Sequence, residues 1–204
     1  MRMLCTAVVL FLCLCLTPCA FAAQTDDAES ALRNSIDQIL SILGDSSYKG
    51  GANRQERDSK LRTHINEIFD FKALTARALG VHWKQFSPQQ QDEASQAMSE
   101  LLEATYRDSL DKYDNQRVEY TDATQLRDNQ VEIRTLVVSN AQKLPINYRM
   151  ELTNGAWRIY DVVIEGVSLV QNYRSQFQDF MLNKTPEELI TLLKDKAAKQ
   201  RSNS

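Results

Sequence analysis

The sequence predicts an α+β fold, with N-terminal helices, a four-stranded curved antiparallel sheet and C-terminal helices in that order. Apolar residues recur at helical spacing from about residue 26 to 112, and they alternate with polar residues from 117 to 164. Helical spacing then returns after Gly166. Helices before and after a run of strands are typical of helices packed on one face of an antiparallel sheet, which can leave a cleft between the layers.

Four helices are expected in the first half of the chain. Gly44 and Gly80 follow apolar helical patterns and end them, and Ser87-Pro88 places a cap and a proline at the start of another. The expected ranges are 26–43, 54–70, 71–79 and 88–112.

Four strands are expected next, at 117–126, 130–139, 143–153 and 156–164. Asp128-Asn129 and Asn154-Gly155 mark tight turns, and the second is a strong hairpin signal. The third strand alternates apolar and polar residues, so one face of the sheet should be covered. Pro145 places the start of that strand at an edge or a bulge.

Two helices should close the fold, at about 167–182 and from the capping box Thr185-Pro-Glu-Glu188 to about Lys199. The first has an apolar stripe that contains one charged residue, Arg174. An arginine in such a stripe must meet an anion or reach water.

The N-terminus has the features of a secretory signal peptide. Arg2 precedes the apolar run Leu4–Leu16, and Ala20-Phe-Ala22 is a small-x-small cleavage site. All four cysteines precede that site, so the mature chain has neither disulfides nor cysteine ligands. We therefore expect an exported protein of residues 23–204 that forms a single domain.

Charge argues against some partners. Arg2 is the one charged residue among the first 22, so the mature chain keeps 23 basic and 27 acidic residues, a net charge of −4. This balance gives no general attraction to nucleic acid or to an anionic membrane.

The usual catalytic groups are scarce. His64 and His82 lack a second histidine at metal-ligand spacing, and Gly166-Val-Ser168 lacks the second glycine of a nucleophile elbow. Asp161 interrupts an apolar strand, and its simplest role is to pair with Arg174 or a backbone amine. A site acid is the alternative.

Several segments resemble the MlaC family of periplasmic phospholipid-binding proteins. The strand–helix junction Trp157–Phe177 carries most of the likeness. Further similar segments are Phe69-Asp-Phe71, Ala78-Leu-Gly80 with Trp83, Phe86-Ser-Pro88, and Glu100-Leu-Leu102 through Tyr106. Together they span about residues 65–193.

The resemblance implies a cone similar to that of nuclear transport factors, enclosing an apolar cavity for the tails of a glycerophospholipid. It also implies a carrier that ferries phospholipid across the periplasm between an outer-membrane lipoprotein complex and an inner-membrane ABC transporter complex. That pathway maintains outer-membrane lipid asymmetry. We expect a monomer, without a cofactor, a metal or enzymatic activity.

Alternation and helical phase suggest which residues contact the tails, with core packing as the alternative for each. Arg174 is expected to hold the head group or to organise the pocket by pairing with Asp161 or Glu165. A small enzyme using Asp161 with Tyr160 or Tyr173, or an adaptor with a filled core, remains open. The expected lipid-binding residues are Leu74, Phe86, Met98, Leu101, Leu102, Tyr106, Ile146, Tyr148, Met150, Ile159, Val163, Val170, Tyr173 and Phe177.

Overall fold

The computed structural model describes residues 18–48, 53–139 and 142–203. Its helices are α1 (Pro18–Gly44), α2 (Arg54–Ile68), α3 (Phe71–Leu79), α4 (Pro88–Asp111), α5 (Leu169–Met181) and α6 (Pro186–Asn203), with short 3₁₀ helices at Ser46–Tyr48 and Gly80–Gln85. The strands are β1 (Arg117–Arg127), β2 (Gln130–Val138), β3 (Lys143–Thr153), β4 (Ala156–Ile164) and β5 (Val167–Ser168). The apolar run Leu4–Leu16 lies outside the described residues, and α1 begins before the expected cleavage site near Ala22.

The strands form one antiparallel sheet in the order β1-β2-β3-β4-β5. The expected α+β fold is confirmed, but the sheet has five strands instead of four. β5 was missed because two residues are too few to show a strand period. It folds back on the end of β4 through Glu165 and Gly166, which both have positive φ, and Gly166 adopts this conformation without strain.

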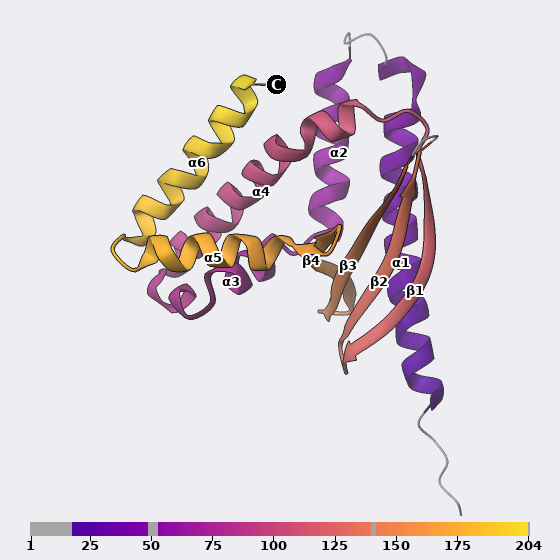
Figure 1. The fold of residues 1–204 in the computed structure, drawn as a ribbon, viewed down its shortest axis with the longest axis horizontal. Coiled ribbons are helices and arrows are strands. Elements are labelled where there is room, and N and C mark those ends of the chain that lie inside the picture. The colour runs from indigo at the N-terminus through magenta and orange to yellow at the C-terminus, as the bar shows by residue number, and fades with distance from the viewer. Residues whose placement is uncertain (1–17, 49–52, 140–141, 204) are drawn as a thin grey trace, which may run out of the picture.

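The helices form two groups around this sheet (Figure 1). α1 runs along one face of the sheet and contacts β1, β2 and β4, and α2 packs on α1. α3, α4, α5 and α6 form a second group, in which α4 lies along α6 and α3 along α5. Ser87 caps α4 and Pro88 is its first residue, as the sequence predicted, and Gln90 completes a capping box with Ser87.

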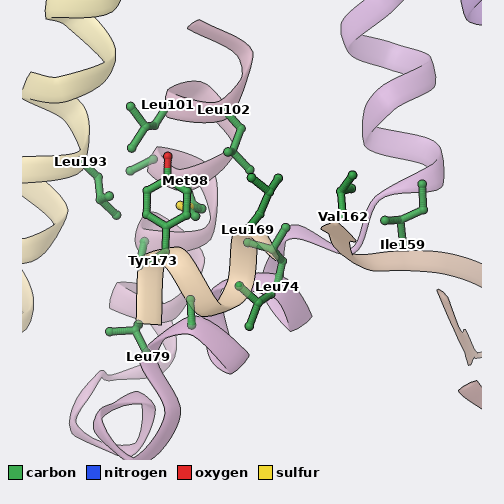
Figure 2. Packing of buried hydrophobic residues seen from close by; sticks show 14 of the residues in the cluster. Leu74, Leu79, Met98, Leu101, Leu102, Ile159, Val162, Leu169, Tyr173 and Leu193 are labelled. Carbon is green, nitrogen blue, oxygen red and sulfur yellow. The ribbon is translucent and has the colours of Figure 1, made fainter. Parts of the chain in front are cut away.

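The second group of helices has a solid core. Leu74 of α3, Met98 of α4, Phe177 of α5 and Leu193 of α6 are almost fully buried. Figure 2 shows side chains from all four helices meeting there, with Ile159 and Val162 of β4 at one side of the view. This core holds the four helices together, whereas a cavity lies beneath α1 and α2.

Candidate functional site: an apolar cavity between helices and sheet

A cavity of about 490 Å³ lies between the sheet and the helices α1, α2 and α4. α1 contributes Leu32, Ile36, Ile39, Leu40 and Leu43 to its wall, an apolar stripe at helical spacing. Protein interiors are packed as densely as organic crystals, with few voids larger than a water molecule. A hollow of this size is therefore a structural feature and not an ordinary packing defect.

The sheet lines the cavity with alternate residues of β3, namely Leu144, Ile146 and Tyr148. Their contribution follows the strand period, because residues two apart share a face. Burial raises the pKa of Tyr148 to about 12, so its hydroxyl stays neutral inside the cavity. Burial also raises the pKa of Tyr106, which lines the cavity from α4.

A β-bulge decides which residues of β4 face the cavity. The pairing of β3 with β4 shifts register between Arg149 opposite Asp161 and Met150 opposite Ile159, which leaves Tyr160 as the extra residue. Ile159 lines the cavity before the bulge, and Val162 and Ile164 line it afterwards. Val163 therefore does not face the cavity, although simple alternation placed it on the face of Ile159.

The structure places the fourteen expected lipid-binding residues in two environments. Five line the cavity, namely Leu102, Tyr106, Ile146, Tyr148 and Ile159. The other nine are buried away from its wall, most of them in the solid core of the second helix group: Leu74, Phe86, Met98, Leu101, Met150, Val163, Val170, Tyr173 and Phe177. Lipid contact by the first five stays a prediction.

The sequence reasoning missed the wall residues of α1 and α2. Leu61, Ile65 and Ile68 of α2 line the cavity together with the five α1 residues. Their apolar stripes were recognised as helical, but a stripe that faces a cavity has the same sequence pattern as one that faces a packed core. A usable signal was the mixture of charged and apolar residues on α2, since Arg57, Asp58 and Arg62 also line the cavity.

Arg174 has a different partner from the one expected. Its Nε and Nη2 both donate to the backbone carbonyl of Arg77, at 3.1 and 2.8 Å, in the last turn of α3. A cation at this position satisfies an unpaired carbonyl and interacts favourably with the helix dipole. Gly80, which follows α3 with φ of +56°, lies close to the guanidinium. The expected pairing with Asp161 or Glu165 is wrong, and Arg174 does not line the cavity.

Asp161 is buried, and its carboxylate is saturated by three donors. Arg149 Nη1 donates to it at 3.0 Å, Ser168 Oγ at 2.6 Å and the backbone amide of Val170 at 3.0 Å. Ser168 in turn caps α5 by accepting from the amide of Gln171. The expected pairing with a backbone amine is confirmed, and the arginine is Arg149. Because Asp161 and Tyr160 lie off the cavity wall, they do not form an acid site inside it.

Six charged residues line the described part of the cavity wall, and all of them belong to α2 and α4. They form ion pairs between these two helices. Arg57 lies 2.5 Å from Asp111, Arg62 lies 2.8 Å from Glu103, and Arg107 lies 3.8 Å from Asp58. We call this row of ion pairs the α2–α4 seam. α2 packs chiefly on α1, and α4 chiefly on α6 and α3, so the seam is joined by side chains more than by close backbone packing.

Within the seam the charged forms are favoured. Burial alone would raise the pKa of Glu103, but Arg62 and Arg107 hold it below its usual range. Burial alone would lower the pKa of Arg57, but Asp58 and Asp111 raise it. The cavity wall is therefore mainly apolar on the α1 and sheet sides and charged along one edge.

The part of the chain that the structure describes holds no cluster of His, Cys, Asp or Glu that could bind a metal ion. None of the described helices is both long and apolar enough to span a membrane.

The fold and the cavity define a class: an α+β protein whose sheet and helices enclose an apolar binding chamber. The chain belongs to the MlaC family, because the family model described as MlaC protein matches residues 33–195. It is similar to the intermembrane phospholipid transport system binding protein MlaC of Haemophilus influenzae, with 26% identity over 68% of this chain and 69% of the relative. Its structure is similar to that of a phospholipid-binding protein from Ralstonia solanacearum solved in complex with a phospholipid. The TM-score is 0.77 at 30% identity, over 85% of this chain and 98% of that one.

Proposed function

We propose that this protein is a phospholipid carrier that encloses acyl tails in the cavity between α1, α2, α4 and the sheet. The observation that carries the proposal is the apolar cavity of about 490 Å³ in a chain of the MlaC family. Its volume is within the range of about 300–1,000 Å³ that is common for ligand pockets. The Ralstonia structure in complex with a phospholipid supports the choice of ligand.

The size of the hydrophobic effect explains why a carrier is needed. Two acyl tails hold about 30 methylenes, and each costs roughly 0.8 kcal/mol to expose, so free passage through water would cost about 24 kcal/mol. A lipid whose tails lie against Leu32, Ile146 and Ile159 avoids most of that cost.

The route is also part of the proposal. The Haemophilus relative is the binding protein of an intermembrane phospholipid transport system. We infer that this chain loses its signal peptide near Ala22 and works in the periplasm as a monomer. It would exchange lipid with an outer-membrane lipoprotein complex and an inner-membrane ABC transporter complex, and so maintain lipid asymmetry.

The carrier itself has little influence on direction. A tail moves between two apolar surroundings when it passes from bilayer to cavity, so that step is close to neutral in free energy. Direction then depends on the relative affinities of the partner complexes or on ATP hydrolysis by the transporter. Such a role needs no covalent chemistry from this chain and no cofactor.

Native mass spectrometry of protein purified from the periplasm, followed by organic extraction, tests the proposal. We expect a mass increment equal to one or more phospholipids and the same lipids in the extract. A protein that carries no lipid, and takes none from phospholipid vesicles after delipidation, would contradict the proposal and favour an adaptor.

A further inference from the structure

We propose that the α2–α4 seam is the subsite for the phosphodiester of the bound lipid, with Arg107 as the residue that holds it and Arg57 beside it. The inference rests on the proposed carrier function and adds where the polar end of the cargo lies. It assigns to the seam a role in choosing lipids that carry a phosphate over neutral lipids with the same tails.

The distribution of polar groups on the wall gives the position. α1 and the sheet present mainly apolar side chains to the cavity, whereas the six described charged residues of the wall all lie along the seam. A phosphodiester inside the cavity but against α1 or the sheet would lie among mainly apolar side chains, at a large desolvation cost. Within the cavity, the seam is therefore the part of the wall best suited to the phosphate.

The charge balance at the seam favours an anion. On the wall the seam pairs three arginines with three carboxylates. Arg54, which lies off the wall, also contacts Asp111 and brings the local balance to four arginines and three carboxylates, one positive charge in surplus. Glu100 is close enough to Arg62 to affect its pKa, but Glu100 is matched by Arg201 at 3.6 Å. One phosphodiester carries the single negative charge that would balance the surplus.

Arg107 is the arginine of the seam with the most unused hydrogen-bonding capacity. Among the described residues it donates one hydrogen bond, to Glu103 at 3.2 Å, and its distance of 3.8 Å from Asp58 is too long for another. A guanidinium has five N–H donors in a planar fork that suits phosphate oxygens. Arg57 is more fully engaged, with two hydrogen bonds to Asp58 and one to Asp111.

Asp58 is the carboxylate that a phosphate would compete with. It lies between Arg57 and Arg107 on the cavity wall, and its side chain is 20% exposed. A phosphodiester held by Arg107 would lie close to the Asp58 carboxylate, and the two negative charges would repel each other. Removing the charge of Asp58 should therefore strengthen phosphate binding, whereas damage to the fold would weaken it.

The test compares lipids with the same tails, of which one carries a phosphodiester head group and the other carries none. Delipidated protein is incubated with vesicles of dioleoylphosphatidylglycerol that contain dioleoylglycerol, it is then separated from them, and the two bound lipids are quantified by mass spectrometry. We expect Arg107→Gln to lower the bound phospholipid-to-diacylglycerol ratio about tenfold, the effect of one hydrogen bond to a charged group. Asp58→Asn should raise the ratio. Arg134→Gln, which removes an exposed ion-paired arginine off the cavity wall, should leave it unchanged.

The outcomes separate the inference from the function on which it rests. An unchanged ratio in Arg107→Gln, or a lower ratio in Asp58→Asn, overturns the phosphate subsite while the carrier function stands. If the unsubstituted protein takes up no phospholipid, both fail. If inorganic phosphate in excess lowers the ratio toward that of Arg107→Gln, it competes with the lipid phosphate for the seam and supports the subsite. If the ratio is high but inorganic phosphate leaves it unchanged in the unsubstituted protein and in Arg107→Gln alike, the preference arises elsewhere and the subsite is overturned.

Discussion

Removal of the bound lipid is expected to lower the stability of this protein by several kcal/mol. The tails would complete a core that the protein alone leaves hollow between α1, α2 and the sheet. Delipidated protein must keep the hollow, admit water at the α2–α4 seam or let α2 collapse inward. Each alternative loses contacts that the loaded state has.

The cavity volume sets an upper limit on this effect. Cavities created by core truncations cost about 24 cal/mol per Å³, which for 490 Å³ corresponds to about 12 kcal/mol. This limit is as large as the whole stability of many domains, about 5–15 kcal/mol. Relaxation of the wall will recover part of it, and we expect a loss of at least about 3 kcal/mol, or roughly 6–12 °C in melting temperature for a chain of this size.

Differential scanning calorimetry of lipid-loaded, delipidated and reloaded protein measures the effect. A phospholipid with the same head group and very short tails is the control, because any ligand stabilises the folded state by mass action. We expect reloading with the long-tailed lipid to restore the melting temperature and the short-tailed lipid to restore little of it. A delipidated protein that melts within 1 °C of the loaded one (a difference of well under about 1 kcal/mol) would refute the idea that tails complete the core.

Three further predictions concern charged groups. Asp161→Asn should cost about 3 kcal/mol in urea denaturation, because it removes the charge from a buried, three-donor network; a loss below about 1 kcal/mol would contradict this. Because few backbone contacts join α2 to α4, we expect lipid to enter by opening of the seam. A bismaleimide bridge between cysteines replacing Arg62 and Glu103 should therefore slow lipid exchange with fluorescent vesicles, whereas the same bridge at Lys72 and Asp92 should not. Equal rates would show that the seam stays closed during exchange. Acid should loosen the seam, because the pKa of Glu103 is lowered from its ordinary value of 4.5. Its ionised carboxylate stabilises the seam fully above pH 4.5, and this contribution is lost as pH falls through the folded pKa. Lipid exchange should therefore become faster below pH 4.5, and Glu103→Gln should remove this pH dependence.

The periodicity of the sequence was sufficient to predict most of the fold. β3, β4 and α3 have the expected bounds, because Asn154-Gly155 separates the two strands, Gly166 follows β4 and Gly80 follows α3. β5 was missed for lack of length. The start of α1 at Pro18 was also not expected, since the helical pattern was read only from Asp26.

The site was harder to predict, because alternation shows which face a residue lies on but not what lies beyond that face. Tyr148 and Met150 share a face of β3, yet Tyr148 lines the cavity and Met150 is packed in the core. The bulge at Tyr160 adds a second obstacle, since one extra residue reverses the facing of Val163. Whether an apolar stripe meets a cavity or another helix depends on tertiary packing, which a local pattern does not contain.

The location of the acyl tails is the central claim, and a photoreactive lipid tests it most directly. A phospholipid with a diazirine near the end of one tail is loaded into the protein and activated by light, and the modified residues are found by peptide mass spectrometry. We predict adducts on the cavity wall, at Leu32, Ile36, Ile146 or Tyr148. Adducts confined to Leu74, Phe177 and their neighbours in the second helix group, or to the protein surface, would contradict the account.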